Sequence, residues 1–254
     1  MRPHRHFKQN RPKKNQLIAG ADAVLKAIAE GVEIERIYLL QTLREEKLLS
    51  IAERRGIPVN KVPAEKLKGF NIEGHNGVVA LKSKIIYRDL QDLISQVIEE
   101  GNAPLLLLLD GITDIRNIGG IARTAWCCGV HAIVIPSKGV GSLNEEAIAT
   151  SAGALEHIPV CREKDMGTII EVLKLNGIAV LASEMTAQTM VYELDFTLPV
   201  AVIMGSEDKG IHPSVYSHCD EVFAIPMRNN FESLNVSAAT AIILYEAMKQ
   251  RLKG

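Results

Sequence analysis

The sequence is poor in cysteine and has no long apolar run. Its four cysteines stand at Cys127, Cys128, Cys161 and Cys219. They form no C-x-x-C pair and no zinc-ligand spacing, so we expect neither a disulfide framework nor a metal site. No apolar segment approaches the length of a membrane span, and the basic N-terminus runs into Lys13 and Lys14 rather than the apolar core of a signal peptide. We therefore expect a cytoplasmic protein without a membrane anchor.

The sequence also lacks an excess of either charge. With 47% hydrophobic and 23% charged residues it should fold as an ordinary globular protein, and a net charge of -1 argues against wholesale coating by nucleic acid. The exception is the N-terminus, which is rich in lysine and arginine and has no acid in its first fourteen residues. Residues 1–15 are interpreted as a basic flexible arm that touches an RNA backbone, although a merely solvated tail has the same composition.

The N-terminal part has a mixed pattern of short elements. Apolar spacing predicts helices over Ala21–Glu30 and Arg44–Arg55. It predicts strands over Ile37–Leu40, Ile57–Val62 and Val78–Leu81. Residues 16–85 are thus expected to form a small α/β domain. A charged amphipathic segment follows and ends in turn residues, so 86–103 is interpreted as a linker.

Beyond Pro104 the apolar runs become more regular. They cover Leu105–Leu109, Ala132–Ile135, Ile178–Ala182, Val200–Met204 and Val222–Ile225. Short apolar runs that alternate with helical segments predict a Rossmann-like, doubly wound parallel sheet over residues 104–254. Ligands of such sheets bind beyond the carboxyl ends of the strands, so the loops after Leu109, Met204 and Ile225 are the candidate site.

Each of these loops carries polar residues that also have a structural interpretation. Asn117 and Arg123 follow the first strand; their structural interpretation is a helix cap for Asn117 and a solvated or salt-bridged cation for Arg123. The second loop, Met204–Gly210, has neither phosphate-binding glycine motif, and its Glu207 would repel a pyrophosphate but tolerate a sulfonium cation. Ser233 and Asn235 stand where a long apolar helix should begin, so capping alone explains either one.

Taken together, the three loops resemble the three ordered motifs of the SpoU (TrmH) family of RNA ribose 2′-O-methyltransferases. These motifs are Asn117-x-Gly-x-x-x-Arg-Thr-Ala125, Gly205-Ser-Glu-x-x-Gly210 and Ile225-Pro-Met followed by Ser233-Leu-Asn-Val-Ser237. The run His75-Asn-Gly-Val-Val-Ala80 is similar to the end of the family's substrate-binding domain, so the resemblance covers nearly the whole chain. It points to the subgroup that modifies a guanosine of large-subunit (23S) ribosomal RNA; transfer RNA is the alternative substrate.

The resemblance implies a cofactor, partners and roles for the site residues. The cofactor is S-adenosyl-L-methionine, the substrate is RNA, and the fold is a SPOUT-type domain with a C-terminal trefoil knot that pairs two subunits into a homodimer. Arg123 is the implied catalytic centre. Asn117, Glu207, Ser233 and Asn235 are implied to position it and the ribose. Main-chain groups of Gly205, Ile225 and Leu234 are expected to bind the cofactor.

The chain departs from the family pattern at four positions. Ile115 stands where proline is usual, and Asn229 where glycine is common, a position at which asparagine best tolerates positive φ. Ala21 and Asn76 stand where arginine and glutamine are frequent. Two other functions compete with the methyltransferase: a dinucleotide-dependent oxidoreductase, disfavoured by the missing glycine fingerprint, and a non-catalytic RNA-binding protein, disfavoured by the presence of all five polar motif residues.

Overall fold

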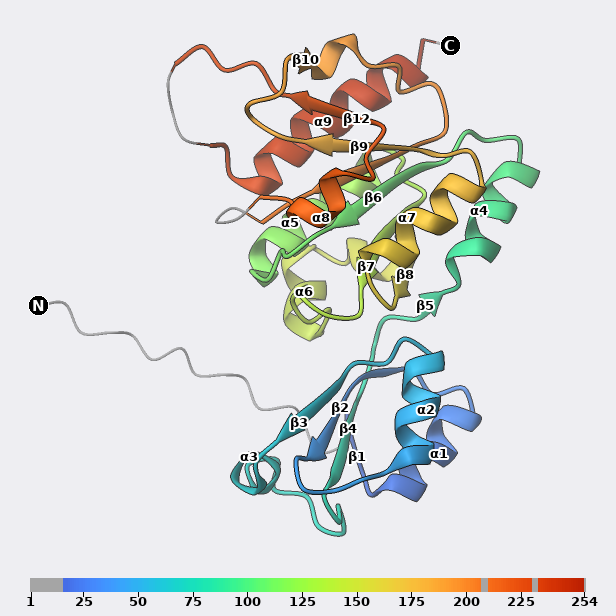
Figure 1. Ribbon diagram of the computed structural model, residues 1–254, viewed down its shortest axis with the longest axis vertical. Helices are drawn as coiled ribbons and strands as arrows, with labels where there is room; N and C mark the ends of the chain where they lie inside the picture. The colour runs from blue at the N-terminus through green and yellow to red at the C-terminus, as the bar shows by residue number, and fades with distance from the viewer. Residues whose placement is uncertain (1–15, 207–209, 230–232, 254) are drawn as a thin grey trace, which may run out of the picture. The chain divides into compact units, whose positions relative to one another are not determined.

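The computed structural model describes residues 16–206, 210–229 and 233–253, and it divides the chain into two compact units, Met1–Ser83 and Lys84–Gly254 (Figure 1). The expected basic arm at 1–15 and Glu207 lie outside the described residues. No helix among the described residues is long and apolar enough to cross a membrane.

The first unit is a small α/β sandwich. Its elements are β1 (Leu17–Ala19), α1 (Ala21–Ala29), β2 (Ile34–Leu40), α2 (Glu46–Arg54), β3 (Val59–Val62), α3 (Ala64–Lys68) and β4 (Val78–Lys82). In the described residues they form a four-stranded sheet in the order β1-β4-β2-β3, in which only β2 and β3 run parallel. Buried residues of α1 and α2 pack on one face, and Leu67 of α3 packs with Leu17 and Val79 on the other.

A tight turn over His75–Val78 leads into β4. Asn76 and Gly77 both have positive φ, at 42° and 87°. The Gly77 N–H donates to Nδ1 of His75 at 3.0 Å, and a Cβ at Gly77 would lie 2.9 Å from Cδ2 of Leu43. Glycine is therefore required at position 77 both by its dihedral angle and by the neighbouring leucine.

The second unit contains the remaining elements. They are β5 (Tyr87–Arg88), α4 (Leu90–Glu99), β6 (Leu105–Leu109), α5 (Ile115–Cys127), β7 (Ala132–Pro136), α6 (Glu145–Thr150), η2 (Ala154–Glu156), β8 (Val160–Glu163), α7 (Met166–Leu175), β9 (Ala179–Ser183), β10 (Thr189–Met190), η3 (Val191–Glu193), β11 (Val200–Met204), α8 (Pro213–Tyr216), β12 (Glu221–Ala224) and α9 (Val236–Arg251).

The described part of this unit holds an eight-stranded sheet in the order β10-β12-β9-β11-β6-β7-β8-β5. Every neighbouring pair in it is parallel, as predicted. The chain builds from β6 through β7 to β8 in one direction, then places β9 on the other side of β6 with β11 between them. This reversal creates the switch point at which ligands of open parallel sheets bind.

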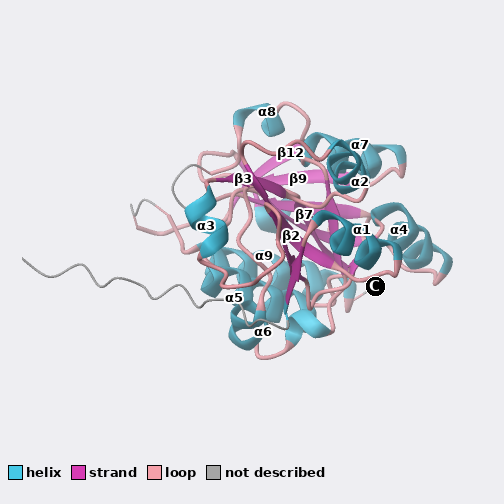
Figure 2. Ribbon diagram, turned by 90° about the horizontal axis from the view of Figure 1, so that it is seen from below, coloured by secondary structure: helices cyan, strands magenta, loops and turns pink. Residues whose placement is uncertain are grey.

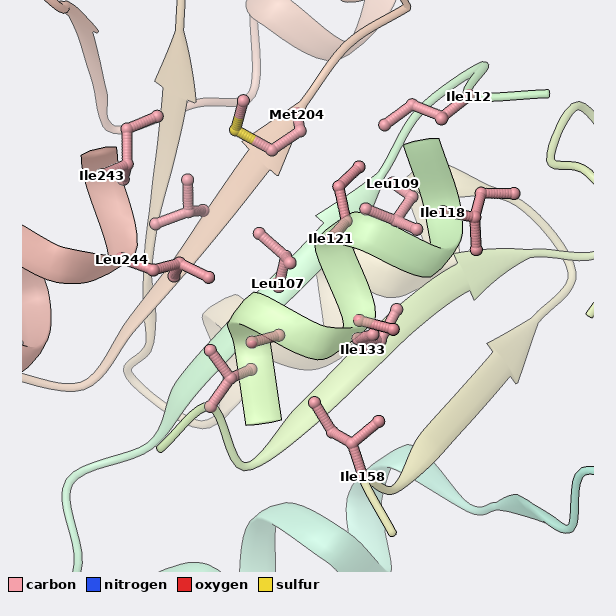
Figure 3. Close-up of a cluster of buried hydrophobic side chains, with 14 of the residues drawn as sticks. Leu107, Leu109, Ile112, Ile118, Ile121, Ile133, Ile158, Met204, Ile243 and Leu244 are labelled. Atoms are coloured by element: carbon pink, nitrogen blue, oxygen red, sulfur yellow. The ribbon is translucent and has the colours of Figure 1, made fainter. Parts of the chain in front are cut away.

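Both faces of the sheet are covered by helices. Figure 2 shows α5, α6 and α9 on one side of the strands and α4, α7 and α8 on the other, in agreement with two separate clusters of buried residues. The five leucines of β6 alternate between them. Leu105, Leu107 and Leu109 join the first cluster, and Leu106 and Leu108 join the second. Figure 3 shows Leu107 and Leu109 in the first cluster. A strand buried on both faces has no polar position, which explains this uninterrupted leucine run.

The segment 86–103, expected to be a linker, is part of the second unit. Tyr87 and Arg88 pair in parallel with Val160 and Cys161 of β8. Helix α4 buries its apolar side in the second cluster, through Leu90, Leu93, Ile94 and Val97. The charged exposed side of this helix suggested a spacer, but its apolar side covers the sheet. The first unit ends at Ser83, so the division between the units precedes this segment.

The C-terminal helix is fixed at its far end. The guanidinium of Arg251 donates to the carbonyl oxygens of Phe196 (2.8 Å), Ala103 (2.5 Å) and Leu198 (2.9 Å). These carbonyls precede β6 and β11, so Arg251 ties the end of α9 to the starts of two central strands. The start of α9 lies at the opposite edge of the sheet, where these strands end.

Candidate functional site

The three polar loops lie at one edge of the parallel sheet. They follow β6, β11 and β12, and because parallel strands end at the same edge, the loops meet there. In the sheet β11 is the direct neighbour of β6, and β9 separates β11 from β12. The topology thus brings together motifs that are far apart in the sequence.

Asp110 joins the first and second loops. Its N–H donates to the carbonyl of Met204 at 2.9 Å, and its carboxylate accepts from the N–H of His212 at 3.0 Å. Asp110 directly follows β6, so its position at the strand end was visible in the sequence. Its role in fixing the second loop was not, because that depends on the pairing of β6 with β11.

Helix α5 begins at Ile115, capped by Asp114, whose carboxylate accepts from the N–H of Arg116 at 2.8 Å. Asn117 is therefore not the helix cap. Ile115 occupies the first helical position, where proline is common but not required, which explains why this departure from the family pattern is tolerated. The structure leaves Asn117 half-buried and facing the third loop.

The two glycines after Asn117 allow neighbouring helices to approach closely. A Cβ at Gly119 would lie 2.7 Å from Thr150 in α6, and one at Gly120 would lie 2.5 Å from Oγ of Ser237 in α9. Both distances are too short for a real side chain. Gly119 therefore allows α5 to pack closely against α6, and Gly120 allows it to pack closely against the start of α9, where the third motif ends.

The second loop is closed by its own main chain. Ser206 and Gly210 exchange two hydrogen bonds, with N···O distances of 3.1 and 2.9 Å. A Cβ at Gly205 would lie only 2.3 Å from the carbonyl carbon of Gly210, and Gly210 itself has a φ of 63°. Both motif glycines are thus needed for the shape of the loop.

The Asn235 side chain in the third motif makes hydrogen bonds to two different helices. It caps α9 by accepting from the N–H groups of Ser237 (3.0 Å) and Ala238 (3.3 Å), and its amide donates to Oδ1 of Asn117 at 3.0 Å. Capping accounts for the first two bonds but not for the third. The Asn235–Asn117 bond therefore connects the first and third motifs directly.

The other predicted residues of the third motif surround this contact in the sequence. Ser233 is exposed, Leu234 is 36% exposed, and Ile225 packs partly buried against the first core cluster. The main-chain N–H and C=O of Leu234 form no hydrogen bond within the described residues. Asn229, at the common glycine position, is not among the residues with positive φ, so the loop does not need glycine there.

Arg123 lies on α5 but not beside Asn117. The two residues are six positions apart, which turns them by about 120° around a helix axis. The Arg123 side chain is exposed and makes no hydrogen bond or ion pair with any described residue. Its guanidinium is therefore available to an anion from solution.

Exposed apolar side chains occur at the same edge. Met185, Met227 and Leu234 are 49%, 39% and 36% exposed, and they lie in the loops after β9, after β12 and before α9. Large apolar side chains exposed in neighbouring loops suit a flat, partly apolar ligand. Within the described residues no group of three or more His, Cys, Asp or Glu is arranged to hold a metal ion.

Comparison with known proteins identifies the family. The SpoU rRNA Methylase family matches residues 104–245, and the RNA 2′-O ribose methyltransferase substrate-binding domain matches residues 17–87. The chain belongs to the SpoU family of RNA methyltransferases. Bacillus subtilis (strain 168) YacO, whose name assigns it to the TrmH family of tRNA/rRNA methyltransferases, is 31% identical over 94% of this SpoU chain and 97% of its own length.

Solved structures share the SpoU fold. AviRb from Streptomyces viridochromogenes, in complex with AdoMet, has a TM-score of 0.61 and 22% identity over 94% of this chain and 91% of its own. An AdoMet-bound rRNA methyltransferase from Sinorhizobium meliloti has a TM-score of 0.60 and 23% identity over 92% and 86%. The predicted α/β fold of the SPOUT class is therefore confirmed.

Proposed function

We propose that this SpoU methyltransferase transfers a methyl group to a ribose 2′-hydroxyl of RNA. The observation that carries the proposal is the hydrogen bond between Asn235 and Asn117, which joins the first and third motifs at the strand ends. Asn117 lies on α5, the helix that also carries Arg123, which has no partner among the described residues. Amide groups and an arginine suit a sugar and a phosphate, and neither group provides a nucleophile for attack on a base.

The cofactor is S-adenosylmethionine, and the residues at the strand edge fit it. Main-chain groups of Gly205, Ile225 and Leu234 would bind it, and those of Leu234 make no hydrogen bond to another described residue. Met227 and Leu234 offer apolar surface for adenine. When bound, this cofactor supplies an electrophilic methyl group on a sulfonium. The second loop closes on itself and has no phosphate-binding glycine motif. It therefore gives no support to the binding of a dinucleotide cofactor.

Arg123 acts on the RNA in this proposal. A guanidinium keeps its proton at any physiological pH, so it cannot serve as a general base. It instead binds the phosphate beside the target ribose with two parallel hydrogen bonds. It also stabilises the ribose 2′-oxygen as negative charge develops on it. The bound phosphate accepts the proton of the 2′-hydroxyl. Asn117, Asn235 and Ser233, with Glu207, hold the ribose in line for attack.

The RNA substrate is assigned to ribosomal RNA, with a guanosine of 23S rRNA as the target. The match of residues 17–87 to a substrate-binding domain supports an RNA partner. Transfer RNA is the alternative target, and the name of the Bacillus relative includes both kinds of RNA.

We further infer a homodimer built on α9, together with a C-terminal trefoil knot. Ala238, Ile242 and Tyr245 lie four and three residues apart and form one exposed stripe of this helix, with Ile242 and Tyr245 42% and 59% exposed. The opposite side of α9 is buried in the first cluster, so the helix is apolar on both sides. A second copy would bury the exposed stripe.

A cytoplasmic location is supported by the four free cysteines.

The test is a methyl-transfer assay with labelled S-adenosylmethionine. In vitro transcripts of 23S rRNA segments, tRNA transcripts and ribosome precursors are offered separately, and the labelled nucleotide is mapped. We expect label in one 23S rRNA segment, on the ribose of a guanosine. Label confined to tRNA would establish the alternative target, and absence of label in both RNA classes and in ribosome precursors would contradict the proposed function.

A further inference from the structure

Glu184 lies between the two loops assigned to the cofactor. It directly follows β9, the strand between β11 and β12. Its N–H donates to the carbonyl of Phe223 in β12 at 2.8 Å, and its side chain is half-buried. The main chain of Glu184 is therefore fixed at the carboxyl edge of the sheet.

Among the described residues, one side chain holds the carboxylate of Glu184. The hydroxyl of Tyr216 in α8 donates a hydrogen bond to its Oε2. Burial, followed by this bond to Glu184, raises the pKa of Tyr216, so the hydroxyl keeps the proton that it donates to the carboxylate. The described residues provide no cation paired with Glu184 and no hydrogen bond to its Oε1. One carboxylate oxygen thus fixes the orientation of the group while the other can accept from a ligand.

The same carboxylate borders the second loop. A Cβ built at Gly210 would lie 3.8 Å from Oε2 of Glu184, and Gly210 closes that loop through its paired bonds with Ser206. The next residue, Met185, is one of the exposed apolar side chains of this edge. Glu184 therefore places an acceptor beside the second loop and the exposed Met185, at the edge of the sheet to which the cofactor is assigned.

The chemical groups of an adenosine identify what such an acceptor binds. Adenine meets apolar surface and main-chain groups, whereas the neighbouring ribose presents two hydroxyl donors. In dinucleotide-binding sheets an acidic residue at the end of the strand beside the glycine loop accepts from a ribose hydroxyl. The position of Glu184, at the end of the strand beside β11, meets the same geometric requirement.

We propose that Glu184 binds a ribose hydroxyl of S-adenosylmethionine and that Tyr216 positions its carboxylate for this contact. The inference rests on the proposed function only in assuming that the cofactor lies at this edge. It assigns a ligand contact to Glu184, which lies outside the three motifs.

Calorimetric titration with S-adenosylhomocysteine tests the contact without turnover. The wild type is compared with Glu184→Gln, Tyr216→Phe and the control Glu171→Gln, an exposed acid on α7. Each protein is also titrated with the 2′-deoxy and 3′-deoxy analogues of the ligand. We expect Glu184→Gln to weaken binding roughly 10-fold or more, as for a lost charge-assisted hydrogen bond. Tyr216→Phe should weaken it less, and Glu171→Gln should not change it.

The decisive result is whether the effect of Glu184→Gln on affinity depends on the ribose hydroxyl of the ligand. The deoxy analogue that lacks the contacted hydroxyl should bind the wild type and Glu184→Gln with equal affinity. If Glu184→Gln weakens both analogues as much as the parent ligand, or if the wild type binds both analogues as tightly as the parent, the ribose contact is wrong. Either result leaves the methyltransferase function intact. Failure of the wild type to bind S-adenosylhomocysteine at all would overturn both proposals.

Discussion

Asn235 donates a hydrogen bond to Asn117 at 3.0 Å across 118 positions of the chain. Asn235 also caps α9, so the start of one helix is fixed to the first turn of another. Gly120 lies against Ser237 of α9 and lets the two helices approach closely enough for this bond. The contact thus requires residues of both the first and the third motif.

Substitution of Asn235 separates capping from positioning. Serine is also a good helix cap but is too short to reach Asn117. We expect Asn235→Ser to keep the thermal stability of the wild type and to lower the methyl-transfer rate on the order of 10-fold. Asn235→Ala should lose the same activity and, in addition, about 1 kcal/mol of stability with the cap. A serine variant with full activity would show that the Asn235–Asn117 bond has no part in the reaction.

Arg123→Ala should abolish most turnover and leave cofactor binding unchanged. The side chain is exposed and has no partner among the described residues, so its loss should not disturb the fold. Removal of one electrostatic contact to the transition state typically lowers kcat on the order of 100-fold to 1000-fold. Single-turnover kinetics and titration with S-adenosylhomocysteine measure the two effects.

The matched control for Arg123 is Arg116→Ala on the same helix. Arg116 is exposed and forms an ion pair with Asp114 at 2.7 Å, and the proposed mechanism gives it no role. Its loss should change kcat by no more than a few-fold. Equal losses in the two variants would assign the effect to the general positive charge of α5 rather than to a specific contact of Arg123.

The sequence predicted the elements whose burial is complete. The strands over Leu105–Leu109 and Val200–Met204 were predicted with the observed bounds, because every residue in them is buried and apolar. The strand Val160–Glu163 was not predicted, because only its first two residues are buried and the others are polar. Edge strands such as Tyr87–Arg88 are too short to produce a pattern.

The contacts within the site could be predicted less well. The motifs located Asn117 and Asn235, but their hydrogen bond depends on how α5 and α9 cross. The pairing of Glu184 with Tyr216 likewise depends on the position of β9 between β11 and β12. Strand order is set by long-range packing, and apolar periodicity carries no information about it.

The boundary between the two units predicts which fragment folds. A fragment of residues 84–254 retains β5 and α4 and should unfold cooperatively and bind S-adenosylhomocysteine. A fragment that begins at Ala103 loses Leu90, Leu93, Ile94 and Val97, all at most 6% exposed. Each such side chain contributes roughly 1.5–3 kcal/mol, and the total is comparable to the whole stability of a domain. Circular dichroism and calorimetry should show the shorter fragment to be largely unfolded; equal stability would make 86–103 a linker after all.

Stability should fall on mild acidification because of His131. Its Nδ1 accepts a hydrogen bond from the N–H of Leu105 at 3.0 Å, and burial, followed by the charge of Arg251, lowers its pKa. The unfolded chain binds a proton near the ordinary histidine pKa of about 6.5, whereas the folded protein resists it to lower pH. The stability that neutral His131 contributes is therefore complete above the ordinary histidine pKa, and it is lost as the pH falls through the pKa of His131 in the folded protein. In His131→Asn, which keeps an acceptor that does not titrate, Tm should fall less between about pH 7 and pH 5; parallel curves would contradict this.

The last prediction concerns the atom that accepts the methyl group. A base methyltransferase must reach or extrude its target base, whereas a ribose methyltransferase requires the 2′-hydroxyl. The site residues around the Asn235–Asn117 bond are amides, a serine and an arginine, which suit a sugar and a phosphate. A substrate RNA with a single 2′-deoxy substitution at the target nucleotide should therefore bind almost as well as the parent, because one hydroxyl contributes only about 1 kcal/mol. It should accept no methyl group, while the same substitution at the neighbouring nucleotide leaves transfer intact. Binding is measured by filter retention and transfer with labelled cofactor on the same RNAs. If the substituted RNA were methylated as fast as the parent, the acceptor would have to be a base, and the roles proposed for Arg123 and the two asparagines would be wrong.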